Sequence, residues 1–446
     1  MSEFEAAVRV EAGPVHRLLK RIIDVRPAET QALGWSWLYI FCVLSSYYIL
    51  RPIRDEMGVA GGVENLQWLF TGTLLGMILV NPPFAALVAK LPRVHFIAAT
   101  YRFFMGNLLI FILLLHMATP EQHIWVGRMF FIWASVFNLF VVSIFWALMV
   151  DVFDSEQGKR LFGFIAAGAT LGGIAGSSLT ASLAVAVPAT YLLLGSAVLL
   201  EAAVFSVRRL SHLSDVLHQR PAAHSEEAVI GGNVLAGLTH AFKSPYLINV
   251  GVYILLFAIT STFLYFQQAE IARQSFADRG ARTAFFARID LWVNVLTLGA
   301  QLFLTGRVLR TIGVGLTLAM LPALSTLGFG TLAMTPTIAV LVVYQVLRRA
   351  GNFAFARPTR EVLFTVVPRE DKYKAKSFID TVIYRTGDQV GAWSYAALGF
   401  LGLAMTGISI VAVPISIAWL LNGLWLGRKQ EGMAAAETRV SPLPTA

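Results

Sequence analysis

The chain has 446 residues, of which 57% are hydrophobic and only 14% are charged, and its formal net charge is +9. Soluble proteins average about 25% charged residues, so this composition excludes an ordinary soluble fold and indicates a membrane protein. Lys and Arg in cytoplasmic loops account for most of the positive charge, so no nucleic-acid partner is predicted. The single cysteine, Cys42, excludes an intramolecular disulfide and a thiolate metal site, and no cofactor is expected.

Apolar stretches recur along the whole chain, and each is close to the length that crosses about 30 Å of hydrocarbon as a helix. They predict about twelve transmembrane helices, at residues 32–53, 64–89, 94–117, 123–150, 160–187, 189–207, 245–268, 283–306, 312–333, 337–367, 374–401 and 404–427. A polar interval after the sixth stretch divides them six and six. The predicted fold class is therefore an all-α membrane protein with two six-helix halves.

An internal similarity supports these two halves. GFIA at Gly163–Ala166 aligns with SFID at Ser377–Asp380, and the same offset pairs Gly173 with Gly387. The fifth and eleventh spans then correspond, as in the parallel duplication of major facilitator transporters. The predicted organisation is a cytoplasmic N-terminal segment at 1–31, a first half at 32–207, a cytoplasmic linker at 208–244, a second half at 245–427 and a cytoplasmic, disordered tail at 428–446.

Lys and Arg concentrate on one side of the predicted bundle. If the N-terminus is cytoplasmic, the inner loops hold most of them, and several outer loops, such as those near Pro188 and Thr335, hold none. Arg273, Arg279 and Arg282 in one outer loop are the exception. This bias predicts that both termini are cytoplasmic. We expect a monomeric, multi-pass protein of the bacterial inner membrane, in contact with the lipid bilayer.

Charged residues inside the predicted spans are costly, so they face a protein interior or a water-filled cavity and mark a pathway. Arg348 and Arg349 lie about eleven residues into the tenth span, and Arg385 and Asp388 lie similarly deep in the eleventh, near the bilayer midplane. Arg385 and Asp388 are three residues apart and can pair along one helix face. The alternative for this pair is a structural role that fastens helices. Glu201 in the sixth span has no obvious partner in the sequence.

The end of the first span, YYILRPIRDEM, carries Arg51, Arg54 and Asp55. An ordinary helix end that reaches the outer water is one interpretation, and a helix that carries the motif deeper is the other. Arg binds phosphate or carboxylate in bidentate fashion, so several Arg in a midplane cavity predict an anionic small-molecule substrate. The predicted substrate-binding residues are Arg51, Arg54, Arg348, Arg349 and Arg385.

Two helix ends on the cytoplasmic side carry charges that could form gates. Asp151 ends the fourth span, and Arg360 and Glu361 occupy the corresponding end of the tenth. Solvated helix ends are the alternative. No Walker A pattern is present, so neither ATP-driven pumping nor another enzymatic activity is predicted. Any energy for transport must then come from a gradient or from exchange.

Three motifs resemble those of the ATP/ADP translocase family of bacteria, intracellular parasites and plastids, which looks like a branch of the major facilitator superfamily. ILRPIRDEM at Ile49–Met57 is similar to the family's I-L-R-D-x-K-D, which places Arg51 on its Arg, Arg54 on its Lys and Asp55 on its Asp. FWALMVDVFD at the end of the fourth span is similar to F-W-x-x-x-N-E and places Asp151 on its Glu.

The third motif begins at ARPTREVLF and resembles the family's D-P-T-K-E, K-G-K-x-x-I-D and G-K-S-G-G. It places Arg360 and Glu361 on Lys-Glu, Lys376 on the second Lys and Asp380 on the Asp. We expect gating or coupling roles for these residues, together with Asp55, Asp151 and Asp388. Asp388 stands where the family has Lys, so the local charge is reversed.

The predicted function is secondary transport or exchange of an organic anion by alternating access, and the resemblance implies nucleotide exchange of the ATP/ADP type. The alternative is a proton-coupled major facilitator that carries another small solute, such as a drug, a siderophore or a peptide. Asp388 or Glu201 would then be its proton site. A non-transporting membrane sensor is the third hypothesis, and the lack of an obvious soluble domain in the sequence argues against it.

Overall fold

The computed structural model describes residues 14–20, 23–90, 93–217, 244–367, 375–376 and 378–440. Ten helices in this part of the chain are long and apolar enough to cross a membrane. Two further helical stretches lie at the remaining two predicted spans. One is α10, which carries Arg282, Arg288 and Asp290, and the other is the run from η4 to α15. The all-α fold class predicted from the sequence is confirmed.

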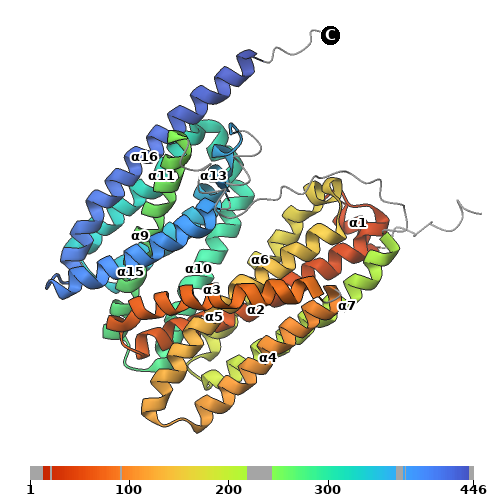
Figure 1. Cartoon of the computed structure of the whole chain (residues 1–446), viewed down its shortest axis with the longest axis horizontal. Coiled ribbons are helices and arrows are strands. Elements are labelled where there is room, and N and C mark those ends of the chain that lie inside the picture. Colours follow the sequence, from red (N-terminus) through yellow and green to blue (C-terminus); the bar gives the residue numbers. More distant parts are fainter. Residues whose placement is uncertain are drawn as a thin grey trace, which may run out of the picture. The chain divides into compact units, whose positions relative to one another are not determined.

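The helices of the first half follow one another with short connections (Figure 1). Their bounds are α1 Pro14–Leu19, η1 Pro27–Glu29, α2 Thr30–Ala60, η2 Val63–Asn65, α3 Leu66–Lys90, α4 Arg93–Met117, α5 Pro120–Val152, α6 Ser155–Leu183 and α7 Ala189–Leu217. Most of the predicted linker, 208–244, lies outside the described residues, although α7 extends into its first ten positions.

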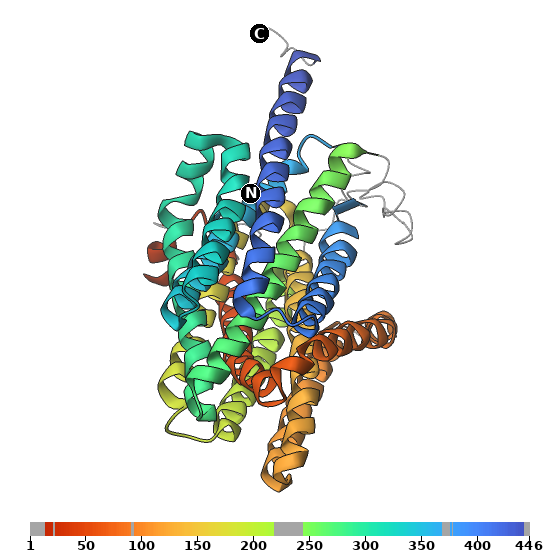
Figure 2. The same ribbon diagram turned by 90° about the vertical axis from the view of Figure 1, so that its left-hand side faces the viewer.

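The second half contains helices that are interrupted near the predicted charges. Their bounds are α9 Pro245–Ser275, α10 Arg279–Phe303, α11 Thr305–Met334, α12 Ile338–Gly351, η3 Asn352–Ala356, α13 Arg357–Leu363, η4 Ile379–Ile383, α15 Tyr384–Phe400 and α16 Met405–Val440. The last helix runs well past Gly427, and Figure 2 shows it (dark blue) extending toward the C-terminus. The prediction of a disordered tail is therefore wrong for residues 428–440.

Local sequence explains where several helices begin. Thr119 caps α5 and Asp154 caps α6. In each case the backbone N–H of the capping residue donates a hydrogen bond to the side-chain oxygen of a Gln three residues later. The side chain of Asp278 accepts a hydrogen bond from the backbone N–H of Ala281 at the start of α10. Such caps satisfy donors that a helix start otherwise leaves unpaired.

The chain divides into two compact units. The first comprises 1–57, 75–226 and 283–291, and the second comprises 58–74, 227–282 and 292–446. The core of the first unit contains Phe130, Phe137 and Phe145, with a buried hydrogen bond of 2.7 Å between the hydroxyls of Tyr39 and Tyr101. In the second unit, α11 packs against α16, and both α15 and α16 pack against α9.

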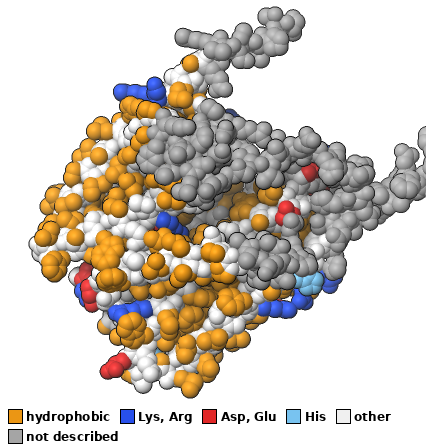
Figure 3. Space-filling model, in the orientation of Figure 1, with side chains coloured by type: hydrophobic (Ala, Val, Ile, Leu, Met, Phe, Trp, Pro, Cys, Tyr) orange, Lys and Arg blue, Asp and Glu red, His pale blue; other side chains and the backbone are white. Residues whose placement is uncertain are grey.

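Many large apolar side chains are exposed on the helices. Leu79 on α3 is 72% exposed and Phe103 on α4 is 64% exposed. Figure 3 shows many hydrophobic side chains on the coloured part of the face in view, with few charges among them. Helices that are hydrophobic all round indicate a lipid environment, because soluble proteins rarely expose so much apolar surface to water.

Glycines of α6 let this helix approach α2 closely. A Cβ added at Gly172 would lie 2.5 Å from the carbonyl oxygen of Phe41, and one at Gly176 would overlap the backbone of Ser45. A hydrogen bond also connects the two helices: the Ser45 hydroxyl donates to the Gly172 carbonyl at 3.1 Å. The sequence pattern of small residues four apart predicts such helix packing, and the structure confirms it here.

We expect Gly176→Ala to lower the stability of the protein by about 1–3 kcal/mol, because the new methyl group meets backbone that cannot move aside. Gly195→Ala on α7 is the matched control, since a Cβ there has no neighbour within 4 Å. Thermal unfolding in detergent measures both variants. Equal unfolding temperatures for the two would contradict the packing argument.

Candidate functional site

Arg348 on α12 is the most enclosed charge of the second unit, with only 3% of its surface exposed. Its Nε donates to the Ser325 hydroxyl at 3.1 Å, and its Nη1 donates to the Ser261 hydroxyl at 2.8 Å. Its Nη2 donates to the Thr260 hydroxyl at 2.8 Å and to the Phe257 carbonyl at 3.3 Å. The Ser325 hydroxyl in turn donates to the Leu321 carbonyl, which leaves its lone pair facing the guanidinium.

This environment solvates the charge of Arg348 without neutralising it. The guanidinium carbon lies 5.2 Å from the ring centroid of Phe257 and 5.8 Å from that of Trp419. Among the described residues, no carboxylate forms an ion pair with it. Hydroxyl dipoles and aromatic faces reduce the desolvation cost, but a buried cation without a counter-charge still favours the approach of an anion.

The neighbouring charges of this unit lie on α12 and α15. Arg349 follows Arg348 on α12 and is half-buried. On α15, Nη1 of Arg385 lies 3.2 Å from Oδ2 of Asp388, so the pair expected from their spacing is present. The side chain of Arg385 is 36% exposed and that of Asp388 is 12% exposed, so Arg385 is the more accessible member. Gly387 beside the pair brings α15 close to Ala258 of α9.

Two π-helical segments adjoin these charges. One, η3, follows Arg348 and Arg349, and the other, η4, ends immediately before α15. A π turn leaves backbone carbonyls without the usual α-helical donors, and here Thr305 donates to the Ala354 carbonyl at 2.9 Å. Such interruptions within membrane helices occur where side chains satisfy the freed backbone, and they are frequent at functional sites.

The motif at the end of the first span lies inside a continuous helix. Helix α2 runs through Pro52 to Ala60, and Asp55 and Glu56 are only 4% and 3% exposed. The interpretation of these charges as a helix end in outer water is therefore wrong. Nη1 of Arg51 lies 3.3 Å from Oδ1 of Asp290 on α10, with side-chain exposures of 18% and 2%. Both residues belong to the first unit.

Arg54 has a different set of partners from Arg51. Its Nη2 lies 2.6 Å from Oδ1 of Asp55, and its Nη1 donates to the Ser135 hydroxyl at 3.4 Å. Its guanidinium also lies 5.0 Å from the ring centroid of Phe131. Of the predicted binding residues in the first unit, both Arg51 and Arg54 thus contact carboxylates, so a substrate anion would have to compete with Asp290 and Asp55 for them.

Four of the predicted gating residues of the second unit form two neighbouring pairs. Arg360 on α13 lies 3.6 Å from Asp380 on η4, and the Lys376 ammonium contacts the Glu361 carboxylate. Both pairs connect the end of the tenth span to the start of the eleventh, so each lies within one half of the sequence. Asp151 is half-buried at the end of α5 in the first unit.

Sequence reasoning missed several polar partners. Glu201 on α7 pairs with Arg102 on α4 at 2.7 Å, and each side chain is 45% exposed. The hydroxyls of Ser261 and Ser325 carried no distinguishing signal, because isolated Ser residues are common in membrane helices. Asp290 lies within the predicted span 283–306, but its partner Arg51 is on a distant part of the chain and no sequence pattern connects the two. No group of three or more His, Cys, Asp or Glu that could hold a metal occurs in the described part of the chain.

Comparisons with known proteins place these clusters in a transporter. No family model matches the chain. It is 20% identical to ADP,ATP carrier protein 2 of Chlamydia pneumoniae, over 95% of this chain and 93% of the relative. It is also 20% identical to ADP,ATP carrier protein 1 of Chlamydia muridarum, over 96% of each. The chain is a distant full-length homologue of the chlamydial ADP,ATP carrier proteins.

Solved structures agree on the fold. An auto-inhibited peptide transporter of the POT family superposes with a TM-score of 0.60 at 15% identity, covering 93% of this chain and 99% of the other. This likeness, together with the homology to the ADP,ATP carriers, identifies a multi-pass membrane transporter with a major facilitator-like fold. The relatives are carriers and not enzymes.

Proposed function

We propose that this transporter exchanges small organic anions by alternating access, and that nucleotides are the first substrate class to test. The observation that carries the proposal is Arg348, a buried guanidinium in a membrane span without a carboxylate partner among the described residues. An anion that reached it would gain charge-assisted hydrogen bonds in a low-dielectric surrounding. Arg349 and Arg385 would supply further contacts, and the names of the relatives support nucleotides.

The charge balance favours a substrate with fewer charges than ATP. Asp388 replaces a lysine of the translocase motif and pairs with Arg385. In the first unit, Arg51 and Arg54 contact Asp290 and Asp55. A substrate panel should therefore run from ATP and ADP to AMP, orthophosphate and dicarboxylates. We further propose a monomer in a bacterial inner membrane with both termini cytoplasmic, as the distribution of Lys and Arg suggests.

The decisive experiment is counter-exchange in reconstituted vesicles. Vesicles preloaded with one unlabelled anion should take up a second, labelled anion, and empty vesicles should not. Exchange of nucleotides would support the nucleotide version, whereas exchange of orthophosphate or dicarboxylates alone would restrict the proposal to other anions. No exchange with any member of the panel would contradict the anion proposal.

Asp388→Asn separates anion exchange from the proton-coupled alternative. If Asp388 only balances Arg385, the Asn variant leaves Arg385 free for the substrate, and we expect a lower KM for the anion with exchange retained. A proton-coupled carrier that uses Asp388 would instead lose uncoupler-sensitive uptake altogether. Glu201→Gln tests the other candidate proton site: because Glu201 is paired with Arg102, we expect exchange to be retained, and a loss of uncoupler-sensitive uptake would instead support proton coupling through Glu201.

A further inference from the structure

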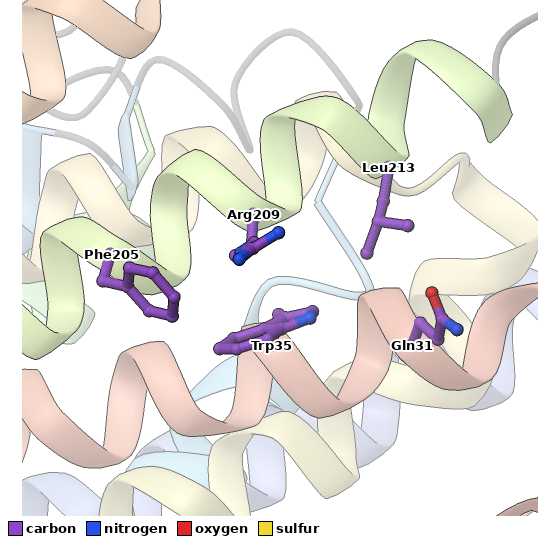
Figure 4. Close-up of a pocket in the computed structure, with 5 residues that line it drawn as sticks. All are labelled: Gln31, Trp35, Phe205, Arg209 and Leu213. Carbon is purple, nitrogen blue, oxygen red and sulfur yellow. The ribbon is translucent and has the colours of Figure 1, made fainter.

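A cavity on the first unit is lined by none of the residues predicted from the sequence to bind substrate or to act as gates. It is lined by two residues of α2, Gln31 and Trp35, and by three of α7, Phe205, Arg209 and Leu213. The lining residues are spaced by four along both helices, so the groove follows the helix axes. Figure 4 shows Arg209 reaching from α7 toward the ring of Trp35 on α2.

The aromatic residues and Arg209 form one contact group. Trp35 and Phe205 pack edge to face with ring centroids 5.6 Å apart, and the guanidinium of Arg209 lies 5.2 Å from the centroid of Phe205. Among the described residues, no carboxylate forms an ion pair with Arg209. The nearby acids Glu29 and Glu156 have partners of their own, at 2.8 Å from Arg160 and from Arg26 respectively.

The position of Arg209 along α7 corresponds to a membrane interface. At 1.5 Å per residue, Arg209 lies roughly 30 Å from the start of α7 at Ala189, which is the thickness of the hydrocarbon layer. Gln31 lies in the first turn of α2 and lines the same cavity as Arg209, so this cavity is at the start of α2. Trp is enriched at this depth, and basic pockets between membrane helices bind acidic lipid headgroups.

The size of the cavity argues against a second transport site. Its volume is about 240 Å³. Pockets for drug-sized ligands span roughly 300–1,000 Å³, so this cavity accommodates a phosphate headgroup or part of an acyl chain, but not a nucleotide. A groove that runs along the helices, with an exposed Arg beside exposed aromatic surface, matches a phospholipid lying against the protein.

We propose that this groove between α2 and α7 binds an anionic phospholipid, with Arg209 contacting the headgroup phosphate and Trp35 and Phe205 contacting the upper part of an acyl chain. Arg209 would supply charge-assisted hydrogen bonds to the phosphate. The amide of Gln31 can donate to the same headgroup. This inference does not depend on which substrate the protein transports, because it concerns a separate face of the first unit.

Native mass spectrometry of the purified full chain tests the proposal. Dioleoyl phosphatidylglycerol and dioleoyl phosphatidylcholine share acyl chains and differ in net headgroup charge. We expect the wild type to retain phosphatidylglycerol in preference, and Arg209→Gln to bind it roughly fivefold more weakly. Arg208→Gln is the matched control, because its side chain points about 100° away and does not line the groove. It should retain wild-type binding.

Three outcomes would overturn the proposal. Equal losses in Arg209→Gln and Arg208→Gln would indicate unspecific attraction, and equal retention of the two lipids would remove the role of the headgroup charge. Displacement of phosphatidylglycerol by an equal concentration of glycerol phosphate would indicate a site for free anions. If Arg209→Gln fails to fold, Arg209→Lys is the substitute variant, because it keeps the positive charge and should still bind phosphatidylglycerol. Loss of phosphatidylglycerol binding in Arg209→Lys would equally count against the proposal.

Discussion

Replacing Arg348 by Gln should reduce anion exchange on the order of 100-fold, because loss of one partner in a desolvated charge contact costs about 2–5 kcal/mol. The Gln side chain can still hydrogen-bond to Ser261 or Ser325, which lie around the present guanidinium. Folding should therefore survive, and the loss should be one of transport. Arg348→Lys keeps a positive charge without the planar fork and should retain part of the activity.

The measurement for Arg348 is the initial rate of counter-exchange, with chromatographic behaviour and thermal unfolding as checks on folding. Arg310→Gln, the same substitution on an exposed Arg of α11, is the matched control and should exchange at the wild-type rate. A substrate that stabilises the wild type against heat should no longer stabilise Arg348→Gln. Wild-type exchange by Arg348→Gln would exclude Arg348 from the binding site.

Breaking the Arg51–Asp290 ion pair should destabilise the protein by about 3–5 kcal/mol, because either single change removes one member of an ion pair that is largely shielded from solvent. Arg51→Gln and Asp290→Asn should both show this loss in thermal or denaturant unfolding. The double variant should be much less destabilised than the sum of the two, since the interaction between the two charges is then lost only once. Additive effects, within about 0.5 kcal/mol, would contradict a direct pair.

The same variants separate a structural role of Arg51 from a binding role. If Asp290 competes with the substrate for Arg51, Asp290→Asn should lower the KM for the anion while it lowers stability. If Arg51 only holds α10 against α2, the KM should stay unchanged. Arg273 and Glu64 form an exposed ion pair at 3.8 Å in the second unit, so Arg273→Gln is the control and should cost no more than about 1 kcal/mol.

The local sequence predicted which charged residues belong to the candidate site, but it did not predict how deeply they are buried or which distant residues they contact. The spacing of Arg385 and Asp388 was enough to predict their pairing, because residues three apart face the same side of a helix. The depth of Arg51 and Arg54 was not predictable. Together with Pro52, Asp55 and Glu56 they resemble a helix end in water. The buried continuation of α2 through them depends on partners as distant in sequence as Asp290.

The hydroxyl surroundings of Arg348 illustrate the limit of sequence reasoning. Ser261 and Thr260 come from α9, Ser325 comes from α11, and neither segment carries a motif that points to α12. Glu201 seemed to lack a partner for the same reason, because Arg102 is on another helix ninety-nine residues away. Helix packing creates such neighbourhoods, and periodicity within one helix carries no information about them.

The sequence by itself predicted a membrane protein of about twelve apolar helices, since hydropathy and length alone decide which segments can leave water. It also determined the Arg-rich character of the candidate site and the resemblance to ATP/ADP translocases. Only the tertiary structure decided that Arg51 and Arg54 contact carboxylates, and that Arg348 is surrounded by hydroxyls with no carboxylate partner among the described residues. The physical reason is that the cost of a buried charge depends on partners that folding brings from distant parts of the chain.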